Sequence, residues 1–283
     1  MMEGSRTLRK LHPSRRDDIG DLVTRRPLPG PEIGHLDPFL FLNHHGPQTY
    51  PPKNRGLPFG PHPHRGFETV TFIVDGELAH RDSGGHESVI ASGGVQWMTA
   101  GRGIVHSELS PASFLERGGD LEILQLWVNL PARLKFTEPN YVGLQRDDIP
   151  RVSTGDGKGV IQVIAGQVSG EAGAMESLTG VAMTTVSLDG GGSVRLAAPA
   201  AREVFLYVVR GQVRIAGKPA PAFHLAELEA DGDAVEIAAD DSSVLLFGHA
   251  EPCREPIVSH GPFVMNTREE IWQAIRDYEA GRI

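Results

Sequence analysis

The sequence predicts an all-β protein, built as a sandwich or a barrel. Short apolar runs rich in Val, Ile, Thr and Phe recur along the chain, and turn residues separate them. The 34 glycines and 21 prolines are spread through all 283 residues, and helical periodicity is nearly absent before the C-terminal end. The runs that we expect to form strands are residues 68–78, 93–101, 121–131, 159–166, 181–191, 203–215 and 242–248.

One amphipathic helix is expected at the end of the chain, at residues 267–280. Thr267 and Glu270 have the spacing of a capping box, and Gly281 is a suitable stop. Apolar side chains follow the cap at helical spacing, at Ile271, Ala274, Ile275 and Tyr278. We expect this helix to close the chain against the β core.

The chain repeats itself at an offset of 135 residues. Residues 72–78, FIVDGEL, resemble residues 207–213, YVVRGQV, and in each an apolar strand reaches a turn glycine that a second strand leaves. An internal duplication of a β domain explains this similarity together with the length of the chain. The alternative is a chance similarity of two strand-turn-strand units. We therefore predict two domains, residues 1–140 and residues 141–283, the second ending in the helix.

Composition and charge argue against several classes of protein. Hydrophobic residues make up 40% of the chain and charged residues 22%, which is typical of a globular protein. The net charge of −9, from 27 basic and 36 acidic residues, argues against direct nucleic-acid binding, which requires a basic surface. It leaves room for a protein partner. We find no signal peptide and no apolar run of the roughly 20 residues that a membrane helix needs.

The single cysteine, Cys253, rules out an internal disulfide and a cysteine-rich zinc site. Without a signal peptide, a reducing cytoplasm is the expected location. We interpret Cys253 itself as structural or incidental, because no general base lies near it in the sequence.

Two short motifs place histidines at a spacing typical of metal ligands. In a strand, residues i and i+2 point to the same face, so His62 and His64 project together, as do His106 and Glu108. Pro63 favours an extended backbone at this point. Two such pairs on facing strands would place three imidazoles and a carboxylate around one point, a set that suits Fe, Ni, Cu or Zn. The alternative is that these are surface or turn histidines.

A second carboxylate, Glu68, competes with Glu108 for the fourth position. It lies four residues after His64, on the same face if no bulge interrupts the strand. At the offset of 135 residues, the three histidines correspond to Ala197, Pro199 and Asp241. We therefore predict one metal site per chain, in the first half.

The remaining histidines are weaker candidates. His44 and His45 are adjacent and would point to opposite faces of a strand, and His80 and His86 flank an expected turn. We interpret these four as surface or hydrogen-bonded side chains, together with His224, His249 and His260. The large apolar residues near the motifs are expected to belong to the barrel core: Phe67, Trp97, Met98 and Trp127.

Three segments resemble the pirin family of the cupin superfamily: PHPHRGFETVTFIVDGELAHRDSGGHE, GGVQWMTAGRGIVHSE and LQLWVNLP. The opening DPFLFLNHHGP and the tail EPIVSHGPFVMNTREEIWQAIRDYEAGRI are also similar to that family, so the resemblance covers nearly the whole chain. It implies a bicupin, two antiparallel β-barrels of the jelly-roll type packed together, with a short C-terminal helix. It also implies one divalent metal ion in the N-terminal barrel, usually iron, with nickel, copper, zinc or manganese as alternatives. The ligands that it implies are His62, His64, His106 and Glu108.

The functions of the family are divided. The resemblance implies that bacterial members act as quercetin 2,3-dioxygenases, which cleave flavonols with O2 and release carbon monoxide. For that reaction, Glu108 would serve both as a metal ligand and as the catalytic base. Animal members are described as nuclear co-regulators of transcription that sense the oxidation state of iron, and other bacterial members as proteins that bind metabolic enzymes.

We expect a metal-dependent dioxygenase that acts on a flavonol such as quercetin. The alternative is a metal- and redox-sensing regulator that binds a protein partner without turnover. A cupin whose metal only stabilises the barrel is less favoured, because domains of this size bury enough apolar surface to fold without a metal.

Overall fold

The chain forms two compact units in the computed structural model, which describes residues 4–283. The first-half unit consists of Arg16–Arg25, Phe39–Arg146 and Cys253–Ile283. The second-half unit consists of the chain up to Arg15, Arg26–Pro38 and Asp147–Pro252. This division differs from a single boundary after residue 140, because the two ends of the chain exchange units. The reason at the N-terminus is strand pairing, since β1 (Leu8–Pro13) lies antiparallel to β22 (His224–Leu228).

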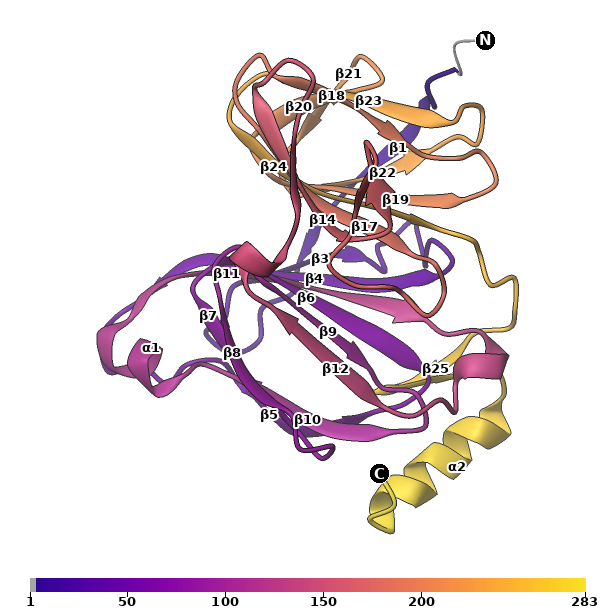
Figure 1. Cartoon of the computed structure of the whole chain (residues 1–283). Coiled ribbons are helices and arrows are strands. Elements are labelled where there is room, and N and C mark those ends of the chain that lie inside the picture. Colours follow the sequence, from indigo (N-terminus) through magenta and orange to yellow (C-terminus); the bar gives the residue numbers. More distant parts are fainter. Residues whose placement is uncertain (1–3) are drawn as a thin grey trace. The chain divides into compact units, whose positions relative to one another are not determined.

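The first-half unit is built around a seven-stranded and a four-stranded antiparallel sheet (Figure 1). The strand orders are β12-β9-β6-β11-β4-β3-β2 and β5-β10-β7-β8. The strands of the larger sheet are β2 (Arg15–Arg16), β3 (Thr24–Leu28), β4 (Phe39–Tyr50), β6 (Phe67–Asp75), β9 (Val95–Thr99), β11 (Gly119–Asn129) and β12 (Asn140–Leu144). Those of the smaller sheet are β5 (Phe59–His64), β7 (Glu77–Asp82), β8 (Glu87–Ala91) and β10 (Ile104–Leu109).

Short elements complete the first-half unit. The helices are α1 (Ala112–Arg117), the 3-10 turn η1 (Ala132–Leu134) and α2 (Arg268–Glu279), and a further turn, η2 (Arg146–Asp148), follows β12. The C-terminal segment adds the hairpin of β25 (Val258–His260) and β26 (Phe263–Met265).

The second-half unit repeats the same arrangement of strands. Its larger sheet has the order β1-β22-β19-β24-β17-β14-β13 and its smaller sheet the order β18-β23-β20-β21. The strands not yet given are β13 (Arg151–Ser153), β14 (Gly159–Ala165), β15 (Gln167–Val168), β16 (Glu171–Ala172), β17 (Ala182–Leu188), β18 (Ser193–Ala197), β19 (Glu203–Arg210), β20 (Gln212–Ile215), β21 (Lys218–Pro221), β23 (Ala234–Ala239) and β24 (Ser243–Ala250). Strands β6 and β7 correspond to β19 and β20, so the sequence repeat lies on equivalent hairpins and supports an internal duplication.

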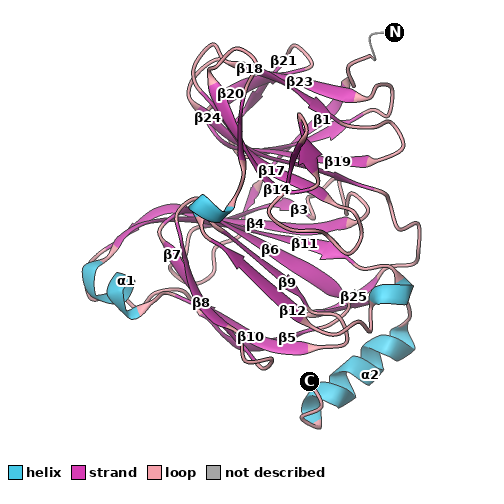
Figure 2. Cartoon of the chain, viewed as in Figure 1, coloured by secondary structure: helices cyan, strands magenta, loops and turns pink. Residues whose placement is uncertain are grey.

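The predicted all-β class is confirmed, and Figure 2 shows how strands dominate both units. Every apolar run named above contains one or two strands. The C-terminal helix is also confirmed: the hydroxyl of Thr267 accepts a hydrogen bond from the Glu270 amide, and the Glu270 side chain accepts one from the Thr267 amide. No helix among residues 4–283 is long and apolar enough to cross a membrane.

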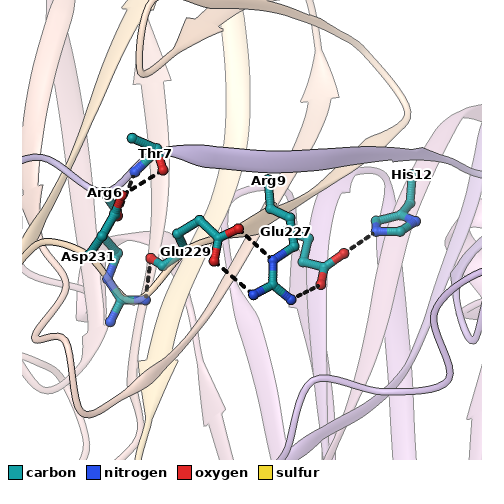
Figure 3. Close-up of polar contacts among 7 residues, drawn as sticks. All are labelled: Arg6, Thr7, Arg9, His12, Glu227, Glu229 and Asp231. Carbon is teal, nitrogen blue, oxygen red and sulfur yellow. Dashed lines mark hydrogen bonds and ion pairs between the residues drawn. The ribbon is translucent and has the colours of Figure 1, made fainter.

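The N-terminal strand is tied into the second-half unit by polar contacts as well as by its pairing (Figure 3). Arg9 donates to Glu229 at 2.8 and 2.7 Å and to Glu227 at 3.1 Å. The Nε2 atom of His12 lies 2.8 Å from the second oxygen of Glu227, and Thr7 donates to Asp231. Because Arg9 and its two carboxylates are partly exposed, we attribute the position of β1 mainly to its backbone pairing and less to these ion pairs.

Candidate metal centre

The three motif histidines meet where β5 and β10 pair. His106 lies opposite His62 in the antiparallel register, and His64 lies opposite Ile104. One ring nitrogen from each of His62, His64 and His106 lies within 4.8 Å of the other two. Their ring centroids are 4.4 to 5.0 Å apart. The strand spacing that the sequence suggests therefore brings the three imidazoles together.

Hydrogen bonds to backbone carbonyls orient two of the three rings. The Nδ1 atom of His62 lies 2.8 Å from the Gly60 carbonyl oxygen, and that of His64 lies 3.2 Å from the carbonyl of Pro262. A carbonyl only accepts hydrogen bonds, so Nδ1 carries the proton in both rings and Nε2 keeps a lone pair. This is the arrangement in which a metal-binding histidine is usually held by its outer contacts.

The facing nitrogens are buried without a hydrogen-bond partner. Nε2 of His64 and both ring nitrogens of His106 make no such contact within the described part of the chain. Buried polar atoms are normally satisfied, so three orphaned nitrogens in one cluster point to a missing ligand. The donor set therefore fits a divalent transition metal.

Burial keeps these rings neutral. It lowers the pKa of His64 to about 3, with a further contribution from neighbouring His62. Burial, followed by the neighbouring histidines, also lowers the pKa of His106 well below its ordinary value. Neutral imidazole is the form that binds a metal, so the site holds its ligands ready for one.

Glu108 faces the same cavity but lies outside the cluster of three histidines. Its Oε1 atom accepts a hydrogen bond from the Thr71 hydroxyl at 3.0 Å, and its Oε2 atom accepts one from Gln125 Nε2 at 2.5 Å. The register of β5 and β10 shifts between His106 and Glu108, where Glu108 lies opposite Phe59. The carboxylate is thus next to the histidines and held by two donors on other strands.

Glu68, the competing carboxylate, has a different environment. It is buried on β6 opposite Thr99 of β9, and its Oε1 atom accepts a hydrogen bond from the Thr99 hydroxyl at 2.7 Å. Burial raises the pKa of Glu68. It does not line the cavity, so the geometry favours Glu108 as the carboxylate that serves the histidines.

The cavity beside the cluster has a volume of about 260 Å³ and an aromatic wall. The rings of Phe41 and Trp127 stack with centroids 4.7 Å apart, and Phe59 contributes a third aromatic side chain. The other lining residues are Asn43, His45, His62, His64, Thr71, Glu108, Ile123, Gln125, Gly261 and Pro262. The cavity therefore combines a flat apolar surface with polar groups at the histidines.

The apolar residues near the motifs have different roles. Trp127 lines the cavity, which differs from the core position expected for it, because it lies with Ile123 and Gln125 on the inward face of β11. Phe67 packs behind it, with ring centroids 4.4 Å apart, while Trp97 and Met98 are buried in the barrel as expected.

A second layer supports His106. The His80 ring lies 5.4 Å from that of His106 and stacks on Tyr141 at 3.9 Å. The Nε2 atom of His80 is 3.0 Å from the buried carboxylate of Asp82, which also contacts His86. The hydrogen-bonded role expected for His80 and His86 is confirmed, and the contact with His106 adds a supporting role that the sequence did not suggest.

The C-terminal segment supplies the carbonyl that orients His64. Arg65 forms an ion pair of 2.8 Å with Asp277 on α2, and both side chains are largely buried. Lys135 donates to the carbonyls of Gly66 and Val264 at 2.8 and 3.0 Å, and its burial lowers its pKa to about 8. These contacts fix the segment beside the cavity, although it is almost 200 residues from His64 in the sequence.

Comparison with known proteins identifies close relatives along most of the chain. The model of the Pirin family matches residues 21–128, and that of the Pirin C-terminal cupin domain matches residues 183–283. A proposed quercetin 2,3-dioxygenase of Pseudomonas aeruginosa is 42% identical, over 88% of this chain and 87% of its own. Human pirin is 38% identical, over 96% of this chain and 91% of its own.

A solved structure resembles the whole chain. The crystal structure of a quercetin 2,3-dioxygenase from Acinetobacter baumannii superposes with a TM-score of 0.92 at 32% identity, covering 99% of this chain and 98% of that one. The sequence similarity and the structural similarity therefore point to the same group of two-barrel proteins.

Proposed function

The chain belongs to the pirin family of bicupins, and we propose that its first-half unit is a metal-dependent dioxygenase that opens a ring of a flavonol-like phenol with O2. The names of the Pseudomonas and Acinetobacter relatives support this reaction class. The observation that carries the proposal is the meeting of three neutral imidazoles and one carboxylate at a cavity with an aromatic wall.

We propose that His62, His64 and His106 hold one divalent metal ion, and that Glu108 is the carboxylate of the site. Iron is the first choice, and nickel, copper, zinc and manganese are alternatives with similar ligand preferences. When bound, the metal would supply Lewis acidity and open coordination positions for a phenolate and for O2 chemistry. The three orphaned nitrogens and their fixed tautomers support this assignment.

The cavity suits a small planar substrate. Its volume of about 260 Å³ is close to the lower end of the range typical of small-molecule sites, about 300 to 1,000 Å³. The stacked pair of Phe41 and Trp127 offers a flat surface for an aromatic ring. Together with Phe59, it would also exclude water from reactive species in the cavity.

Glu108 is the group placed to take the phenolic proton. Both of its oxygens accept hydrogen bonds, so it is held as an acceptor at the wall of the cavity. A phenolic hydroxyl between the histidines and this carboxylate would transfer its proton to a Glu108 oxygen as the substrate binds. The resulting negative charge on the substrate oxygen would lie beside the metal position.

The test is oxygen uptake and carbon monoxide release with quercetin. Metal-free protein would be reconstituted separately with Fe(II), Ni(II), Cu(II), Mn(II) and Zn(II), with His62→Ala protein as the matched control. We expect turnover with at least one metal and none with the control. Stoichiometric metal binding without any oxygen uptake would contradict the enzyme and favour the alternative, a metal-sensing regulator that binds a protein partner.

A further inference from the structure

A chain of directional hydrogen bonds leads from the aromatic wall of the cavity to Glu108. The indole Nε1 of Trp127 donates to Oε1 of Gln125 at 3.2 Å. Nε2 of Gln125 then donates to Oε2 of Glu108 at 2.5 Å and lies 3.3 Å from the Thr71 hydroxyl. That hydroxyl donates to the other oxygen of Glu108.

The direction of this chain is not arbitrary. An indole nitrogen can only donate, so the Gln125 atom that faces Trp127 must be its oxygen. The amide nitrogen of Gln125 is thereby turned toward Glu108. A hydrogen bond to an ionised carboxylate is among the stronger ones in proteins, so this contact holds Glu108 firmly in its present position.

That position is apart from the three histidines. The ring nitrogens of His62, His64 and His106 lie within 4.8 Å of one another, and Glu108 is not part of this group. Yet Glu108 lies two residues after His106 on β10 and faces the same cavity. A carboxylate so placed has two sets of partners within reach, the donors Thr71 and Gln125 or a metal at the histidines.

We propose that Gln125 is a positioning residue that holds Glu108 away from the metal position and so determines when the carboxylate becomes a ligand. The inference rests on the proposed metal site and deepens it. In the arrangement described, the three histidines bind the metal and Glu108 stays with Gln125, available to accept a proton. Only when the hydrogen bond to Gln125 is lost does Glu108 join the metal as a fourth ligand.

This makes Gln125 and the metal competitors for one carboxylate. Removing the amide donor should therefore tighten metal binding, which is the opposite of what loss of a ligand-orienting contact usually does. The gain should depend on Glu108, because only Glu108 is released. The competition can be measured without substrate, so its outcome does not depend on turnover.

The experiment titrates metal-free, full-length protein with Co(II) and follows the visible absorption of the ion. Gln125→Met removes the donor at nearly constant volume, and Gln125→Met with Glu108→Gln tests the dependence on the carboxylate. Gln96→Met is the matched control, because Gln96 is a buried glutamine on neighbouring β9 that donates to the Leu78 carbonyl and does not line the cavity. Trp127→Phe keeps an aromatic wall while removing the indole donor, and it tests the same chain if Gln125→Met does not fold.

We expect Gln125→Met to bind Co(II) about tenfold more tightly than the wild type, which corresponds to about 1.4 kcal/mol. Its absorption bands should weaken as a ligand is added to the ion. Trp127→Phe should shift the affinity in the same direction by less, while Gln96→Met and the double variant should show no gain. Weaker or unchanged Co(II) binding by Gln125→Met, or a gain that persists in the double variant, would overturn the role of Gln125. Wild-type protein that fails to bind Co(II) would instead contradict the metal site itself.

Discussion

The two units share one strand order but use equivalent strands for different purposes. In the first-half unit, β5 and β10 carry His62, His64, His106 and Glu108 towards a cavity. In the second-half unit, the corresponding strands are β18 and β23. Their inward residues are aliphatic and belong to or pack against the unit's core: Val194, Leu196, Val235 and Ile237.

The difference shows that this barrel does not need a metal to fold. The same sheets close around an aliphatic core in one unit and around a polar cavity in the other. The first-half unit has a separate apolar cluster, which includes Ile73, Leu78 and Phe114, and none of the motif histidines belongs to it. We therefore expect the metal site to contribute chemistry and the apolar clusters to contribute stability.

The largest effect expected from this comparison is the loss of a histidine ligand. His106→Ala should abolish turnover and weaken metal binding by more than about 100-fold, since a direct ligand matters more than an outer contact. The protein should stay folded, because its apolar clusters are intact. Metal content, oxygen uptake and thermal unfolding of the same sample check this. Insoluble protein, or protein without a cooperative transition, would show that the metal is structural.

The two carboxylates should differ next. Glu108→Gln should keep metal but lower turnover by about 100-fold or more, because an amide cannot act as a base. Glu68→Gln should keep both metal and most activity, since Glu68 bonds to Thr99 and does not line the cavity. Metal content and oxygen uptake are measured for both variants side by side. The reverse ranking of the two would identify Glu68 as the working carboxylate.

A cavity made in the second-half unit should have the complementary effect. Ile237 is 2% exposed within the aliphatic core, so Ile237→Ala should lower the free energy of unfolding by about 2 to 5 kcal/mol. The metal content per folded chain should not change. Urea unfolding and elemental analysis test the two parts. A fall in metal content at full folding would mean that the two kinds of core are not independent.

Acid should reveal a smaller difference. Burial, and then the charge of Arg202, lowers the pKa of His249 in the second-half unit to about 4. The unfolded chain therefore takes up a proton first, and stability falls as the pH drops from about 6.5 towards about 4. The loss should be on the order of 1 kcal/mol at pH 5, and His249→Gln should flatten this part of the pH profile. An unchanged slope in urea unfolding at pH 7 and pH 5 would contradict this assignment.

Local patterns in the sequence were sufficient for the fold and for the histidines. Apolar runs between turn residues predicted the strands, and the capping box predicted α2, because both signals depend on neighbours in the chain. Two i, i+2 pairs likewise predicted which imidazoles meet. The strand order also refines the comparison at a fixed offset. That offset matched His106 to Asp241, which lies beyond β23, because the turns of the two units differ in length.

The contacts around the carboxylate were beyond such patterns. Thr71, Gln125 and Pro262 reach the site from strands and segments far from the motifs, and no short spacing links them to it. One signal was available: Gln125 and Trp127 alternate with leucine and valine on a buried strand, so a polar side chain shares a face with an aromatic one. That pattern indicates the lining of a cavity as readily as a core position.

The most direct test of the account is the number of metal ions per chain. Metal-free protein would be loaded with Fe(II) or Co(II), freed of excess ion, and examined by elemental analysis beside His62→Ala and Ile237→Ala. We predict one tightly bound equivalent in the wild type and in Ile237→Ala, and none in His62→Ala. Two equivalents in the wild type, or one equivalent retained by His62→Ala, would contradict the claim that the histidines of the first-half unit form the metal site of this protein.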